Sequence, residues 1–175
     1  MAVGKSTVGR RLAERLRLPF CDSDDDLAEA RGITGGELAE RDGVEALHRW
    51  EAGHLRGALA RPEPVVVAAA ASVVDDAASL AALQEPFVVW LRAPAAVLAR
   101  RLEGDDRAAR RRRSLGDGDL VTAVAELAER RARGLAAVAD LTVDTVVDGT
   151  PTPPDEIVSR IAPRIAPVTS GSDER

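Results

Sequence analysis

The sequence has few aromatic residues, one cysteine and one lysine among its 175 residues. The single cysteine, Cys21, excludes an intramolecular disulfide and a metal site made of several thiolates, and it is consistent with a reducing cytoplasm. Aromatic residues make up 2% of the chain and tyrosine is absent, so few side chains are available to stack on nucleic-acid bases. No apolar run approaches the roughly 18 residues that a membrane-spanning helix needs.

Net positive charge is also missing. The chain has 24 basic and 29 acidic residues and a net charge of −5, which does not offset repulsion from phosphate-rich surfaces. We therefore expect neither nucleic acid nor a membrane as a partner. With 45% hydrophobic and 30% charged residues, the chain has the composition of a globular protein that is long enough for one domain with a core.

Helical and extended patterns alternate along the chain. Val8, Leu12 and Leu16 are spaced four apart, which predicts an amphipathic helix over residues 4–18. The same kind of reading predicts strands at 19–22, 65–69, 87–91 and 141–147, and further helices at 24–31, 34–43, 44–61, 75–84, 95–102, 119–139 and 154–161. This alternation indicates a mostly parallel sheet, with ligands expected at the carboxyl ends of its strands.

The one lysine lies in the motif Gly4-Lys5-Ser6-Thr7, directly before the first predicted helix. This is the second half of the phosphate-binding pattern GxxxxGK[ST], or P-loop. Backbone N–H groups at the start of the helix hold phosphate oxygens, Lys5 adds charge between the β- and γ-phosphates, and Ser6 is suited to ligate Mg²⁺. The alternative is a surface Gly-Lys turn before a helix, but the lone lysine and the βαβ setting favour a phosphate loop.

The strand and the first glycine that precede this motif in a P-loop are absent, and Met1 stands at a position inside the loop. In a sheet of this type that strand is central, and each buried backbone group left unpaired beside it costs about 1–3 kcal/mol. We therefore expect the natural start to lie upstream, with Met1 an internal methionine.

Five further motifs are distributed along the chain. Residues 20–24 contain an Asp-x-Asp step, and residues 43–51 form a helix segment that runs from Gly to Glu. Residues 69–72 are a run of small residues after the strand predicted at 65–69, residues 107–113 are rich in arginine, and residues 135–140 run from Leu to Asp. Together with the phosphate loop, they resemble the shikimate kinase family, a branch of the P-loop small-molecule kinases, over residues 1–165.

The resemblance implies a three-layer α/β P-loop kinase fold, with a parallel sheet of order 2-3-1-4-5 whose strand 1 is truncated. It implies one domain over residues 1–165, with a substrate-binding helical insertion at about 24–61, a lid at about 104–118 and a flexible tail at 166–175. The implied activity is ATP-dependent phosphorylation of shikimate to shikimate 3-phosphate, with Mg²⁺, by a cytoplasmic monomer in aromatic amino acid biosynthesis.

The resemblance also assigns roles around the phosphates. Asp22 would lie near Mg²⁺ with Ser6, and Asp24 would hold the substrate hydroxyls and orient the attacking one. The alternative for both carboxylates is an acidic cluster favoured by the helix dipole. The lid would supply Arg107, which would act as a catalytic residue together with Lys5 and Asp24. Arg110 is the second candidate for the lid arginine and would contact the nucleotide. The alternative for this segment is a solvated basic loop.

The substrate-binding positions depart from the family pattern. His48 stands where the family has the arginine that grips the substrate carboxylate, and Arg49 points about 100° around the helix from it. Ala69, Ala70 and Ala71 replace a glycine triplet, and their methyl groups would narrow the pocket floor. Arg131 matches the late substrate-binding arginine, with Arg130 and Arg133 as competitors. Two alternatives stay open: a kinase for another hydroxylated acid such as gluconate, and a non-catalytic nucleotide-binding relative.

Overall fold

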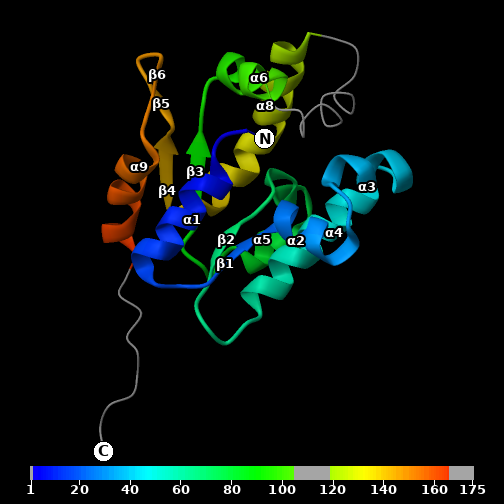
Figure 1. The fold of residues 1–175 in the computed structure, drawn as a ribbon, viewed down its shortest axis with the longest axis horizontal. Helices are drawn as coiled ribbons and strands as arrows, with labels where there is room; N and C mark the ends of the chain where they lie inside the picture. The colour runs from blue at the N-terminus through cyan, green and yellow to red at the C-terminus, as the bar shows by residue number, and fades with distance from the viewer. Residues whose placement is uncertain (1, 105–118, 166–175) are drawn as a thin grey trace, which may run out of the picture.

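Two pairs of parallel strands lie at the centre of the molecule (Figure 1). In the computed structural model, which describes residues 2–104 and 119–165, β1 (Phe20–Asp22) pairs with β2 (Val66–Ala68) and β3 (Val89–Arg92) pairs with β4 (Leu141–Asp144). Cys21 lies opposite Val67 in the first pair. The predicted α/β class with parallel pairing is confirmed. Arg107 and Arg110, with most of the predicted lid, lie outside the described residues, as do Met1 and the predicted tail.

Helices connect and cover these strands (Figure 1). The described helical elements are α1 (Lys5–Leu16), α2 (Ser23–Arg31), α3 (Gly35–Asp42), α4 (Val44–Leu59), η1 (Ala71–Asp75), α5 (Ala77–Ala82), α6 (Ala95–Glu103), α8 (Leu120–Val138), α9 (Pro154–Ile161) and η3 (Ala162–Arg164).

Two predicted elements have different bounds in the structure. The helix predicted over residues 75–84 begins only at Ala77, because Asp76 has extended backbone and its carboxylate accepts a hydrogen bond from the Ser79 N–H at 2.8 Å. The short helix η1, which ends at Asp75, was not predicted. The strand predicted over 141–147 ends at Asp144. Its remainder, β5 (Val146–Val147), forms an antiparallel hairpin with β6 (Thr150–Pro151).

The hydrophobic core consists of separate clusters around the two strand pairs. In the first cluster, α1 and α9 pack on β4 through Val8, Leu12, Val143, Ile157 and Ile161. A second cluster joins α4, η1 and α8 to Leu83, the residue after α5, through Leu55, Val73, Val74 and Val138. Helices α2, α3 and α4 have their own small core of Leu27, Leu38 and Leu47. The predicted insertion at 24–61 therefore has packing contacts of its own.

Candidate functional site

Helix α1 begins directly after Gly4, whose φ of 98° lies in the left-handed region. No side chain caps this helix and its first turn contains no acidic residue. A Cβ placed on Gly4 would have no heavy atom within 4 Å, so there is open space beside the loop. The first N–H groups of a helix carry partial positive charge, and an uncapped, acid-free end of this kind suits a phosphate group. The geometry is therefore compatible with the predicted roles of Gly4, Lys5, Ser6 and Thr7.

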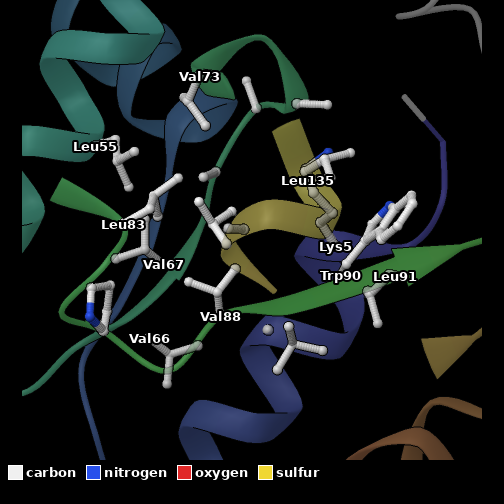
Figure 2. Close-up of a pocket in the computed structure, with 18 of the residues that line it drawn as sticks. Lys5, Leu55, Val66, Val67, Val73, Leu83, Val88, Trp90, Leu91 and Leu135 are labelled. Carbon is white, nitrogen blue, oxygen red and sulfur yellow. The ribbon is translucent and has the colours of Figure 1, made fainter. Parts of the chain in front are cut away.

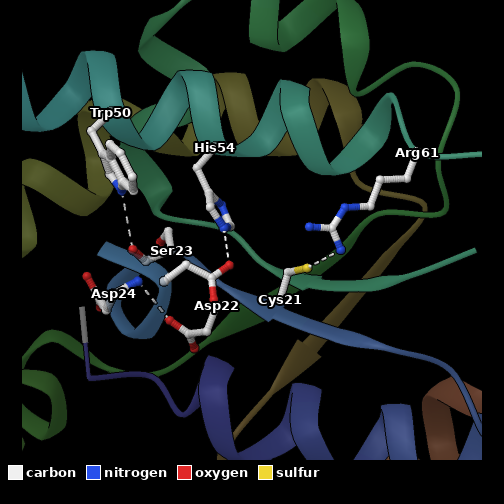
Figure 3. Close-up of polar contacts among 8 residues, drawn as sticks. Cys21, Asp22, Ser23, Asp24, Trp50, His54 and Arg61 are labelled. Carbon is white, nitrogen blue, oxygen red and sulfur yellow. Dashed lines mark hydrogen bonds and ion pairs between the residues drawn. The ribbon is translucent and has the colours of Figure 1, made fainter. Parts of the chain in front are cut away.

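Asp22 ends β1 and caps α2. Its Oδ1 accepts a hydrogen bond from the Asp24 N–H at 2.9 Å (Figure 3). The residue is 4% exposed, and its Oδ2 is buried with no hydrogen-bond partner among the described residues. A buried carboxylate oxygen without a donor is costly, so it favours a bound cation or donor. Carboxylate and hydroxyl oxygens are the ligands that Mg²⁺ prefers, and Asp22 with Ser6 would supply them.

Lys5, the alanine triplet and Arg131 line the same cavity, which has a volume of about 850 Å³. Ala69, Ala70 and Ala71 follow the carboxyl end of β2, while Arg131 comes from α8. Lys5 projects beside Leu135 and Trp90 in Figure 2. Three predicted parts of the site that are far apart in sequence therefore line one cavity.

Arg131 is the one of the three candidate arginines on α8 that lines this cavity. Its Nε and Nη2 donate to Asp75 Oδ2 at 2.8 and 2.7 Å, and its side chain is 11% exposed. Arg130 instead faces Glu126 on the surface of the same helix. Gly134 allows α8 to approach η1, because a Cβ there would lie 3.0 Å from the Cβ of Val74.

His48 and Arg49 are not among the residues that line the cavity. His48 is half-buried on α4 and Arg49 is exposed. Their predicted contact with a substrate carboxylate therefore stays a prediction.

Glu51 and Ser72 form a buried pair that the sequence reasoning did not select. The Ser72 hydroxyl donates to the Glu51 carboxylate, and the two residues are 5% and 6% exposed. Ser72 directly follows the alanine triplet, so the pair holds the turn after β2 against α4. One feature of the sequence could have pointed to Glu51: it lies one turn after His48, within the helix segment 43–51 that resembles the family.

A second missed set of contacts joins α4 to α2 (Figure 3). His54 Nε2 lies 2.5 Å from Asp26 Oδ2, and Trp50 Nε1 donates to the Ser23 carbonyl at 3.5 Å. Trp50 and His54 are four residues apart and so share one helix face. That spacing was the only sequence signal, and it did not identify the partners. These contacts fix the segment that carries Asp24.

Among residues 2–104 and 119–165, no group of three or more His, Cys, Asp or Glu side chains is arranged to hold a metal ion. In the same part of the chain, no helix has both the length and the apolar character needed to cross a membrane.

Comparison with protein families gives one match over nearly the whole chain: the model for "Shikimate kinase" matches residues 1–166. A shikimate kinase from Oleidesulfovibrio alaskensis is 38% identical over 130 residues, covering 74% of this chain and 75% of that protein. One from Caulobacter vibrioides is 38% identical over 133 residues, covering 75% and 64%. One from Zymomonas mobilis is 32% identical over 102 residues, which is 58% of each chain.

Solved structures give the same result for the fold. A shikimate kinase from Acinetobacter baumannii in complex with shikimate matches with a TM-score of 0.79 and 25% identity, covering 92% of this chain and 86% of that chain. A shikimate kinase from Bacteroides thetaiotaomicron matches with a TM-score of 0.76 over 94% of this chain and 93% of that chain, at 22% identity, which supports the fold alone.

Proposed function

Because the chain belongs to the shikimate kinase family, we propose that it transfers the γ-phosphoryl group of ATP to a hydroxyl of shikimate, giving shikimate 3-phosphate. The observation that carries the proposal is the shared cavity in which Lys5, the alanine triplet and Arg131 meet. The cavity runs along β2 and β3, and the alanine triplet lines it at the carboxyl end of β2, where α/β folds bind ligands.

The proposed transfer needs three contributions from this chain. Lys5 and the first turn of α1 hold the phosphates, and Asp24 orients the acceptor hydroxyl and takes its proton. The hydroxyl oxygen bonds to the γ-phosphorus as the bond from that phosphorus to the β–γ bridging oxygen breaks and ADP leaves. Arg107, or Arg110, offsets the charge that develops on the transferred group.

The residues present fit a Mg²⁺ ion, since Asp22 offers a buried carboxylate oxygen with no hydrogen-bond partner in the described part of the chain, and Ser6 stands in the first turn of α1. When bound there with ATP, Mg²⁺ would neutralise phosphate charge during transfer. Asp22 would also fix α2, because its other oxygen accepts the Asp24 N–H.

The substrate side of the proposal assigns Arg131 to the acceptor carboxylate, together with His48 and Arg49 of the insertion at about residues 24–61. In this arrangement Arg131 exchanges its contact with Asp75 for one with the substrate. The alanine triplet forms the pocket floor. For the sheet, the proposal includes the order 2-3-1-4-5, in which β1, β2, β3 and β4 are strands 2, 3, 4 and 5; their pairing as β1–β2 and β3–β4 supports this order.

The experiment is a calorimetric titration of the chain with Mg·ATP, with and without shikimate, together with an assay of ADP release. We expect shikimate to tighten ATP binding and to be phosphorylated. ADP release with gluconate but not with shikimate would show that the acceptor is gluconate and not shikimate. Nucleotide binding without turnover on either acid would favour a non-catalytic relative.

Asp24→Asn and Asp25→Asn form a matched pair for this assay, because both residues lie in the first turn of α2. Asp25 pairs with Arg10 on the surface and its side chain is 58% exposed. We expect the Asp24 variant to lose about 10²–10⁴-fold in turnover and the Asp25 variant to keep it. Equal rates in both variants would remove Asp24 from the mechanism.

A further inference from the structure

Asp75 places a carboxylate on the arginine that the proposed function assigns to the acceptor. The Nε and Nη2 of Arg131 both donate to Asp75 Oδ2, at 2.8 and 2.7 Å. Two parallel N–H groups of this kind are what an arginine offers to a carboxylate in a bidentate pair. An acidic side chain of the chain itself therefore occupies the edge of Arg131 that would hold the carboxylate of an acceptor.

Packing of the backbone sets the distance between the two side chains. Asp75 is the last residue of η1. This short helix lies close to α8 at Gly134, where a Cβ would be 3.0 Å from the Cβ of Val74. Val74 is 7% exposed and directly precedes Asp75 in the chain. The buried neighbour thus holds Asp75 beside Arg131.

The adjacent carboxylate has different partners. Asp76 accepts the Ser79 N–H at the start of α5 and pairs with Arg56 at 2.7 Å. The two neighbouring aspartates therefore act on different elements. A substitution of Asp75 leaves the cap of α5 in place, so its effect on the site is separable from an effect on that helix.

The side chains of the pair differ in exposure: Arg131 is 11% exposed and Asp75 is 46% exposed. A guanidinium that is largely withdrawn from water needs an anionic partner, and Asp75 supplies it. An acceptor carboxylate has to displace this partner, so it gains only the difference between two ion pairs, and it meets the negative charge of Asp75 as it approaches. A neutral acceptor group is not repelled by that charge.

We propose that Asp75 is a specificity-determining residue, whose carboxylate competes with the carboxylate of the acceptor for Arg131 and weakens the binding of anionic acceptors relative to neutral ones. The inference rests on the proposed function, in which Arg131 binds the acceptor. Asp75 acts on acceptor affinity through Arg131, and the transfer step, which Lys5 and Asp24 serve, does not depend on it.

The test compares shikimate with its methyl ester, a neutral analogue that keeps every hydroxyl, in the native chain and in Asp75→Asn. Asparagine keeps an oxygen that can accept from Arg131 but removes the charge. We expect the KM of shikimate to fall by about three- to tenfold, as for the loss of a partly exposed ion pair. The kcat for shikimate and the KM of the ester should stay as in the native chain.

Two further variants control for charge and position. Asp155→Asn removes an aspartate that also pairs with an arginine, Arg11, at 2.9 Å, in a surface contact between α9 and α1; it should leave the KM of both compounds unchanged. Asp75→Glu restores the negative charge beside Arg131 and should return the KM of shikimate towards the native value.

Three results would overturn the proposal. A higher KM of shikimate in Asp75→Asn would mean that Asp75 orients Arg131 for the acceptor instead of competing with it. An equal fall in KM for shikimate and the ester would indicate a general change of the pocket. Equal KM values in the native chain and in Asp75→Asn would mean that the contact has no effect on the acceptor.

Failure of the proposed function gives a different result. A native chain that does not turn over shikimate contradicts the proposed function, and calorimetric titration with shikimate alone then tests the competition. Tighter binding of shikimate by Asp75→Asn than by the native chain would support it, whereas equal binding, or no binding by either, would overturn it.

Discussion

At the residue scale, Asp22 has two distinct tasks on its two oxygens. Oδ1 caps α2, whereas the buried Oδ2 has no partner among the described residues. Asp22→Asn keeps an oxygen for the cap and removes the charge, so we expect stability close to that of the native chain and Mg·ATP binding weakened by about tenfold or more. Asp22→Ala loses the cap as well and should cost about 1 kcal/mol of stability.

Urea unfolding and calorimetric titration of the two variants separate these tasks. Native-like nucleotide binding by Asp22→Asn would show that Asp22 acts only as a helix cap.

Ser72 and Glu51 give a second residue-scale prediction. Ser72→Ala leaves a buried carboxylate without its hydroxyl donor, so we expect a loss of about 1–3 kcal/mol in the free energy of unfolding. Glu51→Gln retains an acceptor for the Ser72 hydroxyl and should cost less. Urea denaturation of both variants is the measurement; a larger loss for Glu51→Gln would mean that the charge, rather than the hydrogen bond, stabilises the pair.

At the scale of elements, two helix caps have a defined pH dependence. Hydrogen bonds from the Ser79 hydroxyl and N–H lower the pKa of Asp76 at the start of α5, and those from the Thr122 hydroxyl and N–H lower the pKa of Asp119 at the start of α8. The caps therefore contribute in full above the unfolded pKa of about 3.9, and their contribution is lost as pH falls through the lower folded value.

We expect no change in this contribution between about pH 5 and pH 8, where both carboxyls are ionised in either state. Carboxyl carbon NMR titration should place both midpoints below the unfolded value of about 3.9. Midpoints at or above it would contradict the assignment of these hydrogen bonds.

Gly134 gives an element-scale prediction for α8. Alanine favours a helix interior by about 1 kcal/mol over glycine, but its Cβ would lie 3.0 Å from Val74, a stiff β-branched side chain. We expect Gly134→Ala to destabilise the protein, and to weaken acceptor binding because α8 carries Arg131. Gly53→Ala on α4, where a Cβ would have no neighbour within 4 Å, is the control and should be neutral or stabilising in thermal unfolding.

The elements that the sequence predicts well are those fixed by local chemistry. The Thr34 and Glu37 spacing predicts a capping box, and the structure confirms it, with the Thr34 N–H donating to Glu37 at 2.7 Å. The short helix η1 and the start of α5 at Ala77 were missed, because the hydrophobic spacing does not change at Asp76, where the backbone is extended. The Ser72–Glu51 and His54–Asp26 pairs depend on how α4 is rotated against its neighbours, which spacing along one helix does not determine.

At the scale of the whole molecule, α1 packs against both strand pairs. Leu12, 7% exposed, packs with Val143 and Ile157, and the same cluster includes Val66 of β2 and Val89 of β3 at its margin. Leu38, 1% exposed, lies instead in the separate core of α2, α3 and α4. The two leucines are therefore matched in type and burial but differ in what they connect.

We expect Leu12→Ala and Leu38→Ala each to cost about 2–5 kcal/mol, since both remove a buried leucine and leave a cavity. Their effects on amide exchange should differ. Leu12→Ala should speed exchange in β1–β2 and in β3–β4 together, because its cluster touches both pairs, whereas Leu38→Ala should do so mainly in α2, α3 and α4. Faster exchange in only one strand pair of the Leu12 variant would mean that the two halves unfold independently, and that α1 belongs to one of them.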